Sequence, residues 1–218
     1  MSNQTIAEQV DTFNGGFTEQ IGPELSGVFA GEQAALNAGG VPDGAVSEGD
    51  TVPDAALVAT DGSSTTLVAA LAGAPAVVVF YRGAWCPYCN IALATYQREL
   101  LPTLRERGVG LVAISPQTPD GSSQAITNGG LEFTVLSDPG NALVRELGIL
   151  TEPSTEARTA HTALGFDVAD SNADATGDIP FPTVLLVDAD RVVRFVDVHV
   201  DYTTRTEVAT IVEALDRL

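Results

Sequence analysis

The chain has 218 residues, of which 44% are hydrophobic, so it is long enough to bury one sizeable α/β core. Acidic residues outnumber basic ones by 29 to 10, and the resulting net charge of −19 disfavours binding to nucleic acid or to a membrane surface. No apolar run approaches the roughly 20 residues that span a bilayer, and the first residues lack the pattern of a signal peptide, so we expect a cytoplasmic protein.

The first 36 residues place apolar side chains at helical spacing and are predicted to be helical. Gly15-Gly16 and Gly22-Pro23 should break this stretch into pieces, because glycine and proline interrupt helices. Residues 37–50 are rich in Gly, Asp and Ser and are predicted to form a linker. A helical arm therefore precedes the main domain.

The rest of the chain alternates between strand and helix patterns. In chain order we expect a hairpin (55–60 and 65–69), a buried strand (76–81), a helix (91–107), a buried strand (110–115), a weak helix (122–128), a short strand (132–136), a helix (141–147), a helix in the poorly patterned segment 149–181 (154–164), two strands (183–188 and 192–198) and a last helix. Pro102 should kink the helix that contains it. Thr204 and Glu207 fit a capping box at the start of the last helix.

This order predicts an α/β fold: a mixed sheet with helices on both sides, including a parallel strand–helix–strand unit. We divide the chain into a helical arm with its linker, residues 1–45, and a main domain, residues 46–218. The arm could cover the main domain or pair with a second copy of the chain in a homodimer.

The only two cysteines, Cys86 and Cys89, are three positions apart, which excludes a secreted disulfide framework. They follow a buried strand and begin a helix, where free backbone N–H groups stabilise a thiolate. A helix terminus contributes up to about 2 kcal/mol, which lowers a thiol pKa from about 8.5 to about 7. Pro87 suits the first helical position, and the Arg82 guanidinium would strengthen the effect by folding over the site. The sequence therefore predicts a redox-active dithiol.

Two other interpretations of the dithiol are a zinc half-site and a pair of inert buried thiols. Zinc usually takes four ligands, and His161 and His199 are far from the cysteines and from each other along the sequence. We therefore expect no metal and no other cofactor. Inert thiols fit poorly with the junction between strand and helix. Arg82 is as compatible with a solvated loop as with a site, and Trp85, the single tryptophan, is interpreted as packing and shielding.

Four short segments occur in an order and at a spacing typical of one superfamily: residues 49–54, 78–90, 111–116 and 136–140. Through them the chain resembles the peroxiredoxin-like branch of the AhpC/TSA superfamily over residues 46–217. The resemblance implies a thioredoxin fold and the reduction of hydroperoxides by thiol chemistry. It also implies that the electron donor is a thioredoxin-like protein or a low-molecular-weight thiol.

The dithiol departs from the superfamily pattern Pro-x-x-x-Thr/Ser-x-x-Cys. Aligned on Cys89, Arg82 stands at the Pro position and Cys86 at the Thr position, while the later Arg of the family falls near Pro182 and is expected to be missing. The dithiol and the segment Phe181-Pro182-Thr183 instead resemble thioredoxin's active site and its cis-proline loop. This likeness implies that substrate contacts come from Trp85, Pro87, Tyr88, Phe181, Pro182 and Thr183.

Three functions are compatible with this dithiol and its surroundings. In a peroxidase, Cys89 attacks the peroxide, Cys86 resolves the sulfenic acid as a disulfide, and Arg82 replaces part of the missing polarisation. In a disulfide reductase, Cys86 attacks a substrate disulfide, Cys89 resolves the mixed disulfide, and Pro182 is cis. The third function is a redox sensor without catalysis. The family-like body places the peroxidase first.

Overall fold

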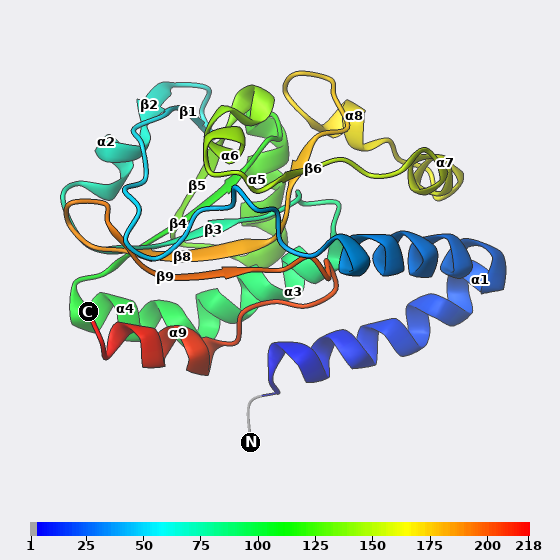
Figure 1. Ribbon diagram of the computed structural model, residues 1–218, viewed down its shortest axis with the longest axis horizontal. Helices are drawn as coiled ribbons and strands as arrows, with labels where there is room; N and C mark the ends of the chain where they lie inside the picture. The colour runs from blue at the N-terminus through cyan, green and yellow to red at the C-terminus, as the bar shows by residue number, and fades with distance from the viewer. Residues whose placement is uncertain (1–3) are drawn as a thin grey trace.

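The computed structural model describes residues 4–218, and no helix within them is long and apolar enough to cross a membrane. Figure 1 shows the elements, with η1 a π-helical and η2 a 3-10 turn. In chain order they are α1 (Ile6–Gly39), β1 (Ala56–Ala59), β2 (Ser64–Thr66), α2 (Leu67–Leu71), β3 (Ala76–Phe80), α3 (Pro87–Thr95), η1 (Tyr96–Leu100), α4 (Leu101–Arg107), β4 (Gly110–Ser115), α5 (Pro119–Gly129), β5 (Thr134–Ser137), η2 (Pro139–Asn141), α6 (Ala142–Glu146), β6 (Leu150–Thr151), α7 (Thr155–Ala163), α8 (Val168–Ser171), β7 (Ile179–Pro180), β8 (Thr183–Val187), β9 (Val193–Val198) and α9 (Val208–Leu215).

A seven-stranded mixed sheet with the order β2-β1-β5-β4-β3-β8-β9 forms the centre of the molecule. The strand β4 pairs in parallel with β3 and β5, and the other pairs in this sheet are antiparallel. The predicted parallel unit and hairpin are both present, and the predicted α/β class is confirmed. The hairpin's second strand ends at Thr66, because the Thr66 hydroxyl caps α2.

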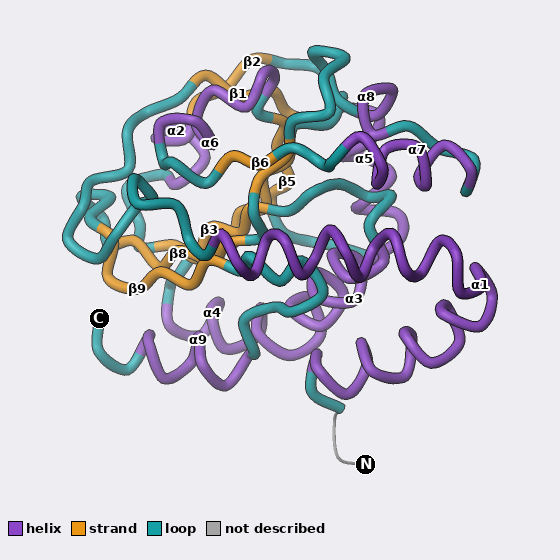
Figure 2. The backbone as a smooth tube through the Cα atoms, turned by 45° about the vertical axis from the view of Figure 1, so that its right-hand side comes forward, coloured by secondary structure: helices purple, strands orange, loops and turns teal. Residues whose placement is uncertain are grey.

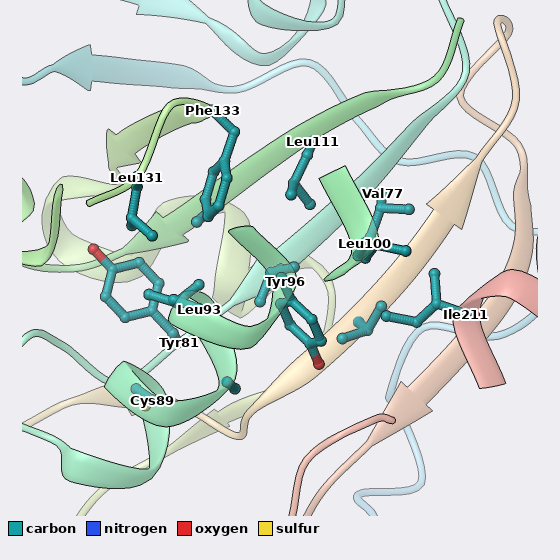
Figure 3. Packing of buried hydrophobic residues seen from close by; sticks show 14 of the residues in the cluster. Val77, Tyr81, Cys89, Leu93, Tyr96, Leu100, Leu111, Leu131, Phe133 and Ile211 are labelled. Atoms are coloured by element: carbon teal, nitrogen blue, oxygen red, sulfur yellow. The ribbon is translucent and has the colours of Figure 1, made fainter. Parts of the chain in front are cut away.

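Alternating side chains of the central strands build a core on each face of the sheet. Val77 and Val79 of β3 point toward α3, η1, α4 and α9, whereas Val78 and Phe80 point toward α2 and α6. Figure 3 shows the first of these cores, which also contains Cys89. Cys86 belongs to the same core, so both thiols of the dithiol are part of the packed interior.

The predicted break at Gly22-Pro23 is confirmed: two helical limbs of α1 meet there at a sharp bend, which Figures 1 and 2 show. Gly22 has φ +78, a left-handed conformation that glycine adopts without strain. The two limbs, residues 6–21 and 23–39, form a V that opens toward α3, and we call this helix the α1 clasp. The predicted break at Gly15-Gly16 is wrong, because the helix runs through both glycines. The expected linker also begins later, since α1 continues to Gly39.

Contacts at both ends hold the α1 clasp on the main domain. The Glu207 carboxylate accepts hydrogen bonds from the backbone N–H groups of Ile6 (3.0 Å) and Ala7 (2.8 Å), the first residues of α1. The Gln33 side chain in the second limb bonds the Val200 carbonyl and the Tyr202 amide, each at 3.0 Å. The predicted capping box at α9 is thus wrong: Glu207 is the N-cap residue of α9, but its side chain caps α1 instead.

The helix that follows the dithiol begins at Pro87, four residues earlier than the apolar pattern indicated. Cys86 is its N-cap and Pro87 its first residue, which explains the early start. The expected kink at Pro102 is replaced by the π-helical turn η1, where the Leu101 N–H reaches back to the Tyr96 carbonyl. That wider turn precedes the proline, which then stands in the first turn of α4, where its missing N–H costs nothing.

Candidate functional site

The loop between β3 and α3 presents the dithiol and is tightly held. The Ala84 N–H donates to Gln117 Oε1 (2.7 Å), and the Asn90 side-chain amide donates to the Ala84 carbonyl (2.8 Å). Gly83 has φ +152, and a Cβ at this position would collide with the Trp85 indole and with Gln117. These contacts hold the backbone of this loop in place without a substrate.

Cys89 lies in the first turn of α3 and is fully buried. Its Sγ is 2.9 Å from Nη2 of Arg205, and Sγ of Cys86 is 3.7 Å from the same nitrogen. Burial opposes the Cys89 thiolate, but the hydrogen bond from Cys86 and the Arg205 charge outweigh burial and hold the pKa of Cys89 well below its usual value. Burial and the hydrogen bond to Cys89 raise the pKa of Cys86 well above the usual value for a cysteine. Of the two sulfurs, Cys89 is therefore the one whose thiolate the site favours.

The position near Pro182 holds no arginine, as the sequence predicts, but Arg205 from elsewhere in the chain contacts Cys89. Arg205 is 9% exposed and comes from the loop between β9 and α9, where its guanidinium also donates to the carbonyls of Tyr202 (2.7 Å) and Thr204. An alignment that looks for an arginine near Pro182 does not find Arg205, which stands 116 residues after Cys89. No local pattern separates Arg205 from the other nine arginines.

A cavity of about 10 Å³ adjoins the Cys89 side of the dithiol. It is lined by Cys89, Arg205, Pro182, Thr183 and His199, among others. A void of this size holds about one water-sized molecule. Two of the predicted substrate-contact residues, Pro182 and Thr183, thus lie at the thiolate.

The predicted cis bond before Pro182 is wrong, because the Phe181–Pro182 peptide is trans. The segment stays extended from β7 into β8: the Phe181 N–H donates to the Ile149 carbonyl (2.8 Å), and the His199 N–H donates to the Pro182 carbonyl (2.8 Å). Phe181 itself faces a second cavity of about 10 Å³, next to Arg82 and Tyr202.

A much larger chamber, about 550 Å³, adjoins the Cys86 side. Its wall includes the predicted residues Trp85, Pro87 and Tyr88. The α1 clasp forms the opposite wall, and the Tyr88 hydroxyl donates to Asn14 of the first limb (2.8 Å). The dithiol therefore has two different sides, a water-sized cavity at Cys89 and a large chamber at Cys86.

Arg82 lies on the chamber side and is 5% exposed. Its guanidinium carbon is 4.4 Å from the ring centre of Tyr202 and 4.9 Å from that of Trp85, so the cation stacks on two aromatic faces. Its charge lowers the pKa of Cys86, although burial raises that pKa more. The structure thus places Arg82 near the dithiol but gives the direct contact with the thiolate to Arg205.

His161 of α7, which the sequence analysis left without a role, is buried in the chamber wall. Its ring centre lies 4.8 Å from that of Phe166 and 5.7 Å from that of Trp85. Burial, followed by the charge of Arg82, lowers the pKa of His161 to about 4. The segment 149–181, whose role the sequence did not indicate, thus covers the dithiol through α7.

This low pKa predicts a pH-dependent stability. Unfolded His161 binds a proton below its ordinary pKa of about 6.5, whereas the folded residue stays neutral down to about pH 4. The unfolded state therefore gains protons first, and stability falls as the pH drops from about 6.5 toward 4, by up to about 1 kcal/mol per pH unit. His161→Phe should flatten this slope. Urea unfolding of both proteins across this range measures it, and parallel slopes would contradict the assignment.

The described residues contain no group of three or more His, Cys, Asp or Glu side chains that could hold a metal ion. His199 instead bonds Thr204 (2.7 Å), Asp197 (3.0 Å) and Thr206 (3.1 Å), which fixes its ring beside the Cys89 cavity. The arrangement is that of a buried dithiol in which an arginine contacts the Cys89 sulfur.

Comparison with known proteins identifies the family. The redoxin family pattern matches residues 47–215. Peroxiredoxin Bcp of Escherichia coli (strain K12) is 30% identical over 111 residues, which cover 51% of this chain and 70% of that protein. The chloroplastic peroxiredoxin Q of Gentiana triflora is 30% identical over 104 residues, 48% of this chain and 47% of the relative, so the chain spans less than half the length of the plant protein it matches.

The solved structures agree on the fold. Reduced Prx3 from Vibrio vulnificus in complex with hydrogen peroxide has a TM-score of 0.63 at 20% identity, covering 78% of this chain and 99% of that one. This likeness confirms the predicted thioredoxin-type fold. The chain belongs to the redoxin family, and peroxiredoxins are its relatives.

Proposed function

We propose that the protein is a thiol-dependent peroxidase in which Cys89 is the attacking thiolate and Cys86 the resolving thiol. The observation that carries this assignment is the 2.9 Å contact from Arg205 Nη2 to Cys89 Sγ. A fixed cation at this position stabilises the thiolate before reaction and the negative charge that develops on the peroxide oxygens during it.

The chemistry takes two steps. The Cys89 thiolate attacks one oxygen of the peroxide, the O–O bond breaks, and the departing oxygen takes a proton to leave as an alcohol or as water. Cys89 is then a sulfenic acid. The Cys86 sulfur attacks the Cys89 sulfur, an S–S bond forms, and the hydroxyl leaves as water. A thiol reductant returns the disulfide to two thiols.

The disulfide-reductase alternative has one supporting feature, because Cys86, its attacking thiol, faces the large chamber. Two features oppose it. The raised pKa of Cys86 keeps that sulfur protonated at rest, and the trans Phe181–Pro182 bond removes the expected cis-proline loop. Peroxide reduction is therefore the better-supported function.

The remaining assignments extend this proposal. The arm, described from residue 4 to residue 45, covers the active site of the domain at residues 46–218, and its contacts with that domain support this role over one in pairing with a second copy. A cytoplasmic site of action is compatible with a dithiol that a reducing compartment keeps available.

Stopped-flow fluorescence tests the function directly, since Trp85 is the single tryptophan and adjoins Cys86. We expect the reduced protein to react rapidly with hydrogen peroxide, losing two thiols for each peroxide consumed. A small disulfide should react slowly, because the resting Cys86 is protonated. Rapid exchange with the disulfide and sluggish reaction with peroxide would overturn the proposal in favour of a reductase.

A further inference from the structure

The two sides of the dithiol suit reactants of different sizes. The Cys89 side has room for about one water-sized molecule, whereas the Cys86 side opens into about 550 Å³. In the proposed cycle, the peroxide oxygens must meet Cys89, and a reductant must meet a sulfur of the Cys86–Cys89 disulfide. The sulfur that borders the large chamber is Cys86. The chamber is therefore placed for the reductant.

The chamber wall is rich in aromatic side chains. The α1 clasp contributes Phe13, Phe17 and Phe29, all half-buried, and the main domain contributes Trp85 and Phe166 across from them. Although the protein carries a net charge of −19, none of the described residues that line the chamber is acidic. Transfer of a hydrocarbon group from water into such a space lowers the free energy. An anion that enters meets no like charge in the lining.

Arg82 supplies a buried positive charge that lies within ion-pair distance of no carboxylate in the described part of the chain, although Glu32 and Glu152 line the small cavity on its other side. Its side chain is 95% buried and lines the chamber, and in the described part of the chain it forms no ion pair. Its contacts are the rings of Tyr202 and Trp85. Burying an unpaired charge is costly unless a partner arrives, so the arrangement favours an anionic ligand.

The α1 clasp limits the size of the partner. Cys86 is 1% exposed, and the first limb is bonded across the chamber through Asn14 and the Tyr88 hydroxyl, while the second limb is bonded through Gln33 and Tyr202. A protein surface cannot reach the Cys86 sulfur unless these contacts break. With these contacts in place, the chamber of about 550 Å³ has room for a small thiol.

We propose that the chamber binds the reductant of the Cys86–Cys89 disulfide, and that this reductant is a low-molecular-weight thiol with an apolar body and an anionic group. The proposal rests on the proposed function, in which that disulfide forms. The apolar body lies among the clasp phenylalanines, and the anionic group lies at Arg82.

The reduction balances with two thiol groups. The reductant thiolate attacks Cys86 Sγ, the Cys86–Cys89 bond breaks, and Cys89 leaves as the thiolate that Arg205 stabilises. The product is a mixed disulfide between the reductant and Cys86. A second thiol attacks the reductant sulfur of this mixed disulfide, which releases Cys86 with a proton and the oxidised reductant.

Three probe thiols test the proposal. Mercaptohexanoate carries a hydrocarbon chain and a carboxylate, mercaptohexanamide is its uncharged match, and mercaptoacetate keeps the charge but lacks the chain. The protein is first oxidised with diamide, so the assay does not depend on peroxidase activity, and Trp85 fluorescence follows the reduction. We expect mercaptohexanoate to react roughly tenfold faster than the amide, as a charge-assisted contact implies. Without a site, the net charge of −19 would make the anion the slower reagent.

Two variants and one control variant locate the effect. Arg82→Gln should abolish the preference for the carboxylate, whereas Arg217→Gln, at an exposed arginine of the C-terminal segment, should keep it. Phe17→Ala should slow both hexyl thiols and leave mercaptoacetate unchanged. Equal rates for carboxylate and amide in the wild-type protein, or faster reduction by a thioredoxin at equal concentration, would overturn the proposal. A failure of the peroxidase would appear separately, as a slow reaction of the reduced protein with hydrogen peroxide.

Discussion

Cys89→Ser is expected to abolish oxidation by peroxide, while Cys86→Ser leaves the first oxidation intact and stops the cycle at a sulfenic acid. The two thiols differ because Cys89 holds the contact with Arg205 and the lowered pKa, whereas Cys86 has a raised pKa. A serine hydroxyl cannot replace the thiolate as nucleophile. It also cannot condense with a sulfenic acid to form a disulfide.

Dimedone, which labels sulfenic acids, separates the cases by mass spectrometry after one equivalent of peroxide. We expect one adduct on Cys89 in Cys86→Ser, none in Cys89→Ser, and little in the wild-type protein, where the disulfide forms first. The wild-type protein treated with diamide is the control for a disulfide formed without peroxide. An adduct on Cys86 in Cys89→Ser, or mixed disulfides trapped there by small disulfides, would reverse the roles of the two cysteines.

The elements that carry the dithiol could be predicted because their signals are local. The apolar run at residues 76–81 marks a buried strand, and Pro87 marks the first turn of a helix, so the position of both thiols follows from neighbouring residues. The parallel pairing of β3 with β4 follows from the intervening helix.

Features that depend on contacts between distant parts of the chain have no local sequence pattern from which they could be predicted. Arg205 reaches Cys89 from a loop 116 residues away, and an arginine between two threonines looks the same in a solvated turn. Glu207 fits the pattern for capping its own helix but bonds the start of α1 instead. The chamber depends on the bend at Gly22-Pro23, whose direction is set by packing rather than by the two residues themselves.

Arg205→Gln is expected to slow the oxidation of Cys89 by roughly 10²–10³-fold at neutral pH, the usual cost of losing one preorganised donor. Glutamine removes the charged donor at Cys89 Sγ and the positive charge that holds the pKa of Cys89 low. Because the pKa of Cys89 is lowered, the wild-type rate should reach its plateau at a lower pH than the rate of the variant. In the variant, the thiolate should form only at higher pH, so its rate should rise with pH and the deficit should shrink.

This pH profile separates a role in the reaction from a role in folding. Arg205 is buried and bonds two backbone carbonyls, so its loss also lowers stability, but a purely structural loss would reduce the rate equally at every pH. Arg205→Lys keeps the charge without the guanidinium fork and should recover part of the rate. Arg217→Gln is the control for an exposed arginine. A neutral-pH rate in Arg205→Gln equal to that of the wild-type protein would show that Cys89 reacts without this contact, and the thiolate would then depend on the helix terminus and on Cys86 alone.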